Sequence, residues 1–209
     1  MTMWQHFQAG GWAMWLILVW LVAAAVVFVH RSFYFFGAHQ EAAVFTAAVT
    51  KLVEIGDWDR AIKLSSAAKT PLGRITAEGL AKAHLGPRAF QSGVDEAALR
   101  ELPAIRRYID FMAFFANLAM LSGLFGTIVG LIKSFGSVGG EGIDLEAKSR
   151  VLAEGIGEAM NCTAFGLLTA MLALVGFALL SWWATAIEEA LDLETVKILN
   201  AVVSRTGGF

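Results

Sequence analysis

Three long apolar stretches interrupt a chain that otherwise shows helical spacing of apolar and polar residues. They run roughly over residues 9–29, 111–132 and 159–187. Each is long enough to cross a bilayer core of about 30 Å as a helix. The third stretch contains no charged residue and exceeds the roughly 20 residues that one span needs. We therefore expect the third helix to tilt or to protrude from the membrane.

The segment between the first two stretches predicts several shorter helices. Asp57 follows Gly56 and is a plausible N-cap, and Thr70-Pro71 is typical of a helix start with proline in the first turn. Gly86-Pro87 is expected to end that helix. From about Val94 the helical pattern resumes and continues into the second apolar stretch. It predicts one long helix, with a possible kink at Pro103.

Composition places the chain in a membrane. Its 209 residues are 57% hydrophobic and 16% charged, with a mean hydropathy of +0.62, whereas soluble domains carry about 25% charged residues. No strand signature or internal repeat occurs. The sequence thus predicts an all-α membrane protein. The net charge of −2 and the lack of a dense basic face argue against nucleic-acid binding. One cysteine, Cys162, cannot form an internal disulfide.

Charge asymmetry predicts the orientation of the three helices. No Lys or Arg precedes the first stretch, unlike a secretory signal, and most of the basic residues lie between His30 and Asp110. The positive-inside rule puts that segment in the cytoplasm, so the N-terminus is outside and the C-terminus inside. The predicted segments are a first transmembrane helix at 1–30, a cytoplasmic helical region at 31–110, a second transmembrane helix at 111–133, a short periplasmic loop at 134–152, a third transmembrane helix at 153–187 and a cytoplasmic tail at 188–209.

Small residues recur along the second and third spans. Gly126 and Gly130 form a GxxxG pair, and Gly123 pairs with Thr127 at the same spacing. Gly166 belongs to a small face of the third span, which also contains Ala159, Thr163, Ala170 and Ala173. Such faces let helices approach closely in lipid. We expect them to pack helices and to drive assembly into a ring.

Glu158 lies about one turn inside the third span, where a carboxylate is costly unless it faces water or a bundle interior. The alternative is that Glu158 sits at the membrane interface near Glu154 and is simply solvated. The middles of the first and second spans have no Asp, Glu, His, Lys or Arg. Threonine hydroxyls can orient water but do not titrate near neutral pH. If protons move here, a partner must supply the acid.

Two stretches resemble a known family. "LSGLFGTIVGLIKSF" is similar to the second-span motif of the MotA/TolQ/ExbB proton channel family, and "LAEGIGEAMNCTAFGLLTAMLAL" is similar to its third-span motif. The cytoplasmic "GDWDRAIKLSSAAKTPLGRITAEGL" also resembles the family. The ExbB/TolQ branch of the family has this layout, with one span, a large cytoplasmic segment and two further spans. The MotA branch has four spans instead.

The resemblance implies a homopentamer in the bacterial inner membrane. The pentamer would surround two copies of a single-span ExbD/TolR-like protein that carries a membrane Asp. Proton-motive force would drive relative rotation of the two parts and energise an outer-membrane or periplasmic partner. Thr127 and Thr163 match the family's two pore threonines, and Glu158 matches its pore-side glutamate. No cofactor is implied.

One position departs from the family pattern. The third span usually has Ile-Pro after the small face, and this chain has Met171-Leu172. The helix is therefore expected to be straighter there. This departure puts in doubt an assignment to the iron-uptake or cell-division branch, and gliding or another surface process is an alternative.

Three classes of function compete at this stage. The leading interpretation is a proton-driven motor subunit that energises outer-membrane transport, envelope maintenance or surface motility. The alternative is a non-conducting structural scaffold, which needs the small residues but not Glu158. An intramembrane enzyme is disfavoured, because the sequence has no His-Glu-x-x-His motif, no Ser-Lys or Ser-His pair at membrane depth and no metal-ligand spacing among its histidines.

Overall fold

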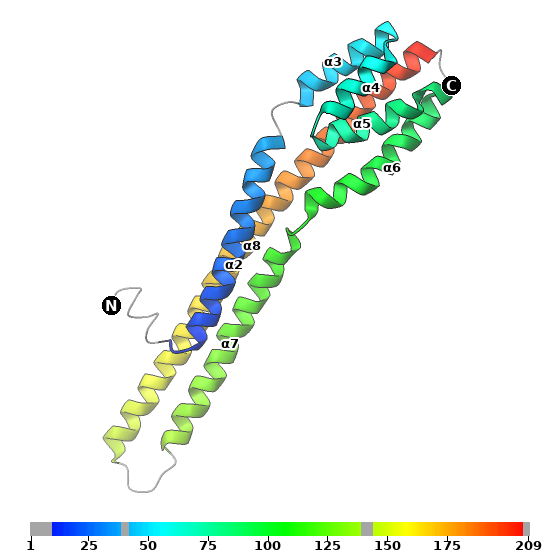
Figure 1. Ribbon diagram of the computed structural model, residues 1–209. Helices are drawn as coiled ribbons and strands as arrows, with labels where there is room; N and C mark the ends of the chain where they lie inside the picture. Colours follow the sequence, from blue (N-terminus) through cyan, green and yellow to red (C-terminus); the bar gives the residue numbers. More distant parts are fainter. Residues whose placement is uncertain (1–9, 39–41, 139–143, 207–209) are drawn as a thin grey trace. The chain divides into compact units, whose positions relative to one another are not determined.

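The computed structural model describes residues 10–38, 42–138 and 144–206, and all of its regular elements are helices (Figure 1). The predicted first span, outer loop and C-terminal tail therefore extend in part beyond the described residues. No strand occurs in the ranges described. Three helical stretches are long and apolar enough to cross a membrane, so the predicted all-α, multi-pass membrane protein is confirmed. The described helices are α2 (Ala13–Ala38), α3 (Ala42–Ile55), α4 (Trp58–Ala67), α5 (Pro71–Lys82), the single 3-10 turn η1 (Ala83–Leu85), α6 (Pro87–Arg106), α7 (Asp110–Val138) and α8 (Leu145–Thr206).

The chain divides into two compact units, and two helices contribute to both. Unit 1 comprises residues 1–30 and 108–180, and unit 2 comprises residues 31–107 and 181–209. The predicted span at 111–133 lies within α7, and the predicted span at 153–187 lies within α8. Both helices continue into the range predicted as the outer loop, and α8 continues through the predicted tail as far as Thr206.

Unit 1 buries small residues and exposes large apolar ones. The buried positions of α7 recur every three or four residues: Met112, Ala116, Ala119, Gly123, Gly126, Gly130 and Ser134. Those of α8 follow the same spacing and include Ala159, Cys162, Ala170, Ala173 and Leu180. Large side chains such as Trp15, Val26 and Ile132 are exposed. This is the arrangement expected in lipid, where close backbone packing replaces hydrophobic burial.

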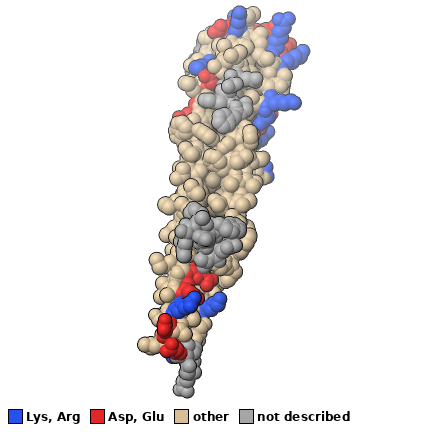
Figure 2. Space-filling model, turned by 90° about the vertical axis from the view of Figure 1, so that its left-hand side faces the viewer, with Lys and Arg blue, Asp and Glu red and all other residues tan. Residues whose placement is uncertain are grey.

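The surface of unit 1 matches this placement. Its apolar band is the tan surface in Figure 2, and charged side chains gather where the α7–α8 hairpin turns. The residues at that turn include Glu146, Lys148, Arg150 and Glu154. An uncharged surface that ends at charged side chains is the pattern expected where helices leave a bilayer.

Local capping signals build the helices of unit 2 as the sequence predicts. Asp57 accepts a hydrogen bond from the backbone N–H of Arg60 at 3.2 Å and caps α4. Thr70 accepts from Gly73 N–H at 3.2 Å, and Pro71 occupies the first turn of α5. Gly86, with φ +106°, separates η1 from α6. The predicted starts of α4 and α5 are confirmed. The next boundary differs, because α5 ends at Lys82, before Gly86, and α6 begins at Pro87 rather than near Val94.

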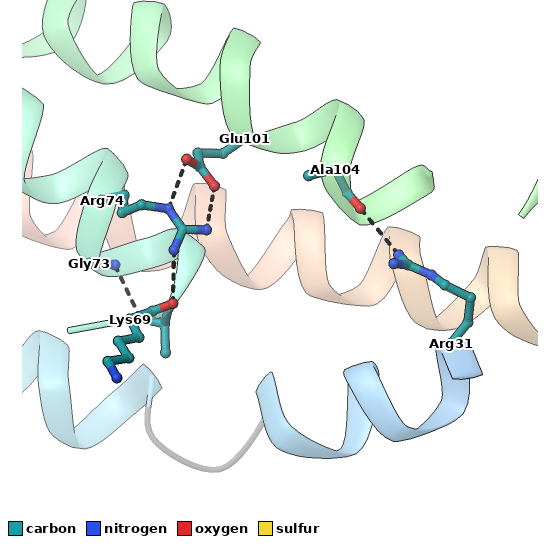
Figure 3. Close-up of polar contacts among 7 residues, drawn as sticks. Arg31, Lys69, Gly73, Arg74, Glu101 and Ala104 are labelled. Atoms are coloured by element: carbon teal, nitrogen blue, oxygen red, sulfur yellow. Dashed lines mark hydrogen bonds and ion pairs between the residues drawn. The ribbon is translucent and has the colours of Figure 1, made fainter. Parts of the chain in front are cut away.

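Unit 2 has a conventional apolar core. Val53 of α3, Ile75 of α5 and Phe90 of α6 are almost fully buried, together with Ile198 of α8. On the outside, Arg74 of α5 donates to both carboxylate oxygens of Glu101 on α6, at 2.8 and 2.5 Å, and to the carbonyl of Lys69 at 2.8 Å (Figure 3). The hydrogen bond with Glu101 raises the pKa of Arg74 above its ordinary value.

The predicted long helix through Pro103 into the second span is wrong. Pro103 lies inside α6, which ends at Arg106, and α7 begins at Asp110 after Tyr108 with φ +69°. Arg31 of α2 donates through Nη2 to the carbonyl of Ala104 at 3.3 Å (Figure 3), and the same nitrogen donates to the carbonyl of Ile105. A continuous helix would offer these two carbonyls to backbone N–H groups four residues later. Arg31 donates to these carbonyls instead, and so it satisfies the hydrogen-bonding capacity of the last carbonyl groups of α6.

Candidate functional site

Two predicted pore threonines meet between α7 and α8. Thr163 Oγ1 donates to Thr127 Oγ1 at 3.5 Å, which is a long and weak hydrogen bond. Thr127 Oγ1 in turn donates to the carbonyl of Leu124 at 2.5 Å, with the carbonyl of Gly123 3.4 Å away. The result is a short directional chain from Thr163 through Thr127 to the α7 backbone. Both side chains are half-buried.

Glycine contacts bring these threonines together. A Cβ placed on Gly166 would lie 2.9 Å from both the carbonyl oxygen of Ala119 and the Cα of Gly123. A Cβ on Gly123 would lie 2.9 Å from the carbonyl oxygen of Cys162. The backbones of α7 and α8 are therefore in direct contact beside Thr163. Short hydroxyl side chains on the two helices can reach each other only at such a close approach.

The two glycines of the GxxxG pair in α7 differ in how closely other helices approach them. A Cβ on Gly126 would lie 2.8 Å from Cβ of Ala13 on α2 and 3.0 Å from Cβ of Cys162 on α8. A Cβ on Gly130 would make only ordinary contacts, at 3.5 Å or more, with Ala159. The sequence interpretation assigned these small faces to helix packing and to ring assembly. The structure shows the packing between helices of one chain, and ring assembly stays a prediction.

Glu158 and Thr163 lie on different faces of α8. Five residues separate Glu158 from Thr163, which corresponds to about 140° around a helix. The half-buried Glu158 carboxylate sits against Gly11, in the turn before α2. One turn further along α8, Cys162 Sγ donates to the carbonyl of Gly10 at 2.8 Å. The structure thus brings the two threonines together and directs Glu158 towards α2.

Several residues of this site carry no obvious sequence signal. Gly10 and Gly11 lie outside every motif, although a Gly-Gly pair before an apolar helix is a turn signal. Trp20 of α2 donates through Nε1 to Ser122 Oγ of α7 at 3.1 Å, and its ring stacks on Phe115 at a centroid distance of 6.1 Å. These contacts anchor α2 to α7. Only the alternation of aromatic and small residues could have indicated them.

Titratable side chains do not cluster in a way that suits a metal ion. Within the described residues, no group of three or more His, Cys, Asp and Glu is close enough to hold one. The chemistry that the site offers is therefore a pair of hydroxyls at the α7–α8 contact, with one carboxylate on another face of α8. Such a site can pass hydrogen bonds along a path, but the threonine hydroxyls do not titrate near neutral pH.

Comparison with known proteins identifies the class. Residues 67–192 match the MotA/TolQ/ExbB proton channel family. Two relatives in Synechocystis sp. are biopolymer transport proteins named ExbB-like 1, 36% identical over 111 residues, and ExbB-like 3, 33% identical over 113 residues. The Tol-Pal system protein TolQ of Haemophilus influenzae is 33% identical over 90 residues.

These alignments cover 52%, 54% and 43% of this chain and 43%, 53% and 38% of the respective relatives. The chain thus spans about half the length of the curated relatives it matches. The fold defines the class as a helical membrane protein with three spans and a pair of threonines in its α7–α8 hairpin. The chain belongs to the MotA/TolQ/ExbB proton channel family, and its relatives support the ExbB/TolQ branch.

Proposed function

We propose that this chain is the multi-pass subunit of a bacterial inner-membrane motor that uses the proton-motive force. In this proposal it forms a homopentamer around two copies of a single-span ExbD/TolR-like protein with a membrane Asp. The complex energises outer-membrane transport, envelope maintenance or surface motility. The observation that carries the proposal is the hydrogen-bonded pair of Thr127 and Thr163, in a chain that belongs to a proton channel family.

The direction of the hydroxyl chain suggests how a partner acid would be handled. Thr163 donates towards Thr127, so the oxygen of Thr163 keeps lone pairs that can accept a hydrogen bond from a protonated carboxyl. Rotation of the Thr163 hydroxyl would let it donate to an ionised carboxylate instead. The same side chain can therefore serve both protonation states of the partner. The 3.5 Å Thr163–Thr127 contact is weak and is easily exchanged.

The chain itself performs no covalent chemistry in this proposal, so we do not assign it an enzymatic activity. Energy comes from moving protons across the membrane, which is worth about 2.3 kcal/mol per charge per 100 mV. Motion follows if the partner's carboxyl meets a different threonine pair after each protonation and release. In this arrangement Glu158 lies towards the outer end of the path.

A non-conducting scaffold is the competing proposal, because the small faces alone explain helix packing. The discriminating experiment replaces both hydroxyls and keeps the side-chain shape. The double variant Thr127→Val, Thr163→Val should assemble normally with its partner and should lose most proton flux. The partner would be taken from a neighbouring gene that encodes one N-terminal span with an Asp. Flux would be followed with a pH-sensitive dye in proteoliposomes, and assembly by native mass spectrometry.

Thr169→Val is the matched control, since Thr169 is a buried threonine of the same helix about 120° away from Thr163. It should retain both assembly and flux. Full flux in the double variant would show that the two hydroxyls only pack. An intact wild-type complex that conducts no protons under an imposed gradient would support the scaffold.

A further inference from the structure

The turn that begins α2 lies directly against Glu158. Gly11 has φ +67°, and a Cβ added there would collide with Glu158 Oε1. The neighbouring Gly10 carbonyl accepts the hydrogen bond from Cys162 Sγ at 2.8 Å. Two consecutive glycines thus contact two side chains of α8, and those two side chains lie one helical turn apart.

The spacing on α8 makes this a two-point contact. Residues four apart lie on the same face of a helix, so Glu158 and Cys162 face the α2 turn together. Cys162 is 1% exposed and packs with Ala13, Met14 and Ile17 of α2. The apolar packing and the thiol hydrogen bond hold the turn in place. The missing side chain of Gly11 leaves the space that the carboxylate occupies.

We propose that Gly11 is a positioning residue for Glu158. Together with the Cys162–Gly10 hydrogen bond, it holds the carboxylate beside the first helix of the same chain, away from the α7-facing side of α8. This inference deepens the proposed function, because it makes the start of α2 part of the outer end of the proton path. Any displacement of α2 then displaces the carboxylate as well.

The competing explanation is that Gly11 serves only the backbone, since positive φ favours glycine by itself. Gly86 provides a control for strain at a positive φ away from Glu158. It has φ +106°, and a Cβ there would meet nothing within 4 Å. Gly157, next to Glu158 on α8, also has open space around its Cβ position. Gly86→Ala therefore tests backbone strain alone, and Gly157→Ala tests a local change beside the acid.

The test measures the reactivity of Glu158 in the full chain in native membranes. Dicyclohexylcarbodiimide reacts with carboxyl groups, and its adduct on Glu158 would be quantified by mass spectrometry over a time course. Glu154 is the internal reference, because its side chain is 68% exposed. Gly11→Ala should raise the labelling rate of Glu158 several-fold. Gly86→Ala and Gly157→Ala should leave it unchanged.

A shorter acid provides the rescue. In a Glu158→Asp background the carboxylate withdraws from Gly11, so adding Gly11→Ala should no longer change labelling at residue 158. Cys162→Ala removes the thiol donor and should raise Glu158 labelling without introducing any collision, which keeps the test valid if Gly11→Ala folds poorly. Unchanged labelling in both Gly11→Ala and Cys162→Ala would overturn the proposal, as would an equal change in Gly86→Ala. Labelling needs neither partner nor flux, so this outcome is independent of the motor proposal.

Discussion

Arg31 is the residue on which the end of α6 depends. Its side chain is nearly buried, at 4% exposure, and the guanidinium carbon lies 4.6 Å from the ring centre of Tyr34 and 4.9 Å from that of Phe35. The same guanidinium donates to the carbonyls of Ala104 and Ile105. A planar cation with several donors can stack and donate at once, which an ammonium cannot do as well.

Loss of Arg31 should destabilise unit 2. Arg31→Leu leaves two carbonyls at the end of α6 without their donor, and an unsatisfied buried polar group costs about 1–3 kcal/mol. Arg31→Lys should fall in between, because it keeps the charge but not the forked geometry. The measurement is the free energy of unfolding of the detergent-solubilised chain. Arg60→Leu is the control, since the Arg60 side chain is 78% exposed and pairs with Asp57 at the surface. Equal losses for Arg31→Leu and Arg60→Leu would refute the assigned role.

Sequence reasoning gave Arg31 no role of its own and counted it only among the basic residues between His30 and Asp110. The structure buries this residue. Its partners lie 73 and 74 residues away in the chain. No local pattern contains that information. Asp57 and Thr70 were predictable for the opposite reason, because each caps an N–H only three residues ahead.

At the scale of elements, the α7–α8 contact depends on individual glycines more than on the GxxxG motif. Periodicity correctly placed small residues on one face of each span. It could not tell Gly126, which is enclosed by α2 and α8, from Gly130, which is not. The difference arises because α2 contacts α7 at Gly126 as well as α8. A motif that describes the pairing of two helices does not encode this additional contact.

Alanine substitutions should separate these glycines. Gly166→Ala forces a Cβ to 2.9 Å from backbone atoms of α7, and overpacking of this kind typically costs about 1–3 kcal/mol. Gly130→Ala should be tolerated, since its Cβ would make only ordinary contacts. Thermal unfolding in detergent would compare the two variants, and native mass spectrometry would report assembly. Equal stability of both variants would show that the close approach at Gly166 relaxes without cost.

The break between α6 and α7 is a second element-scale lesson. Helical periodicity continues from Val94 into the second span, so the sequence favours one helix. Pro103 was the only visible interruption, yet α6 continues past it to Arg106. The chain instead leaves the helix at Tyr108, with φ +69°. Arg31 occupies the last carbonyls of α6 there, and this tertiary contact is not encoded in any local pattern.

At the scale of the whole molecule, apolar length and composition were enough to predict the all-helical fold and the spans. The resemblance supplied Thr127 and Thr163, which the structure brings into contact. The same sequence reasoning grouped Glu158 with them as pore-lining. Its contact with Gly11 joins residues far apart in the chain, so only the folded arrangement shows that this carboxylate is held by α2. Its role in the proton path stays a prediction.

Orientation in the membrane is the remaining prediction, and it rests on the basic residues concentrated between His30 and Asp110. Single cysteines at Ser66 and Leu145, in a Cys162→Ser background, should react from opposite sides. Both positions are exposed, and serine keeps a donor for the Gly10 carbonyl. A membrane-impermeant maleimide should label Leu145→Cys through the periplasm of cells with a permeabilised outer membrane, and Ser66→Cys only after the inner membrane is opened. Labelling of both from the same side would overturn the N-out, C-in topology and, with it, the outer position of Glu158.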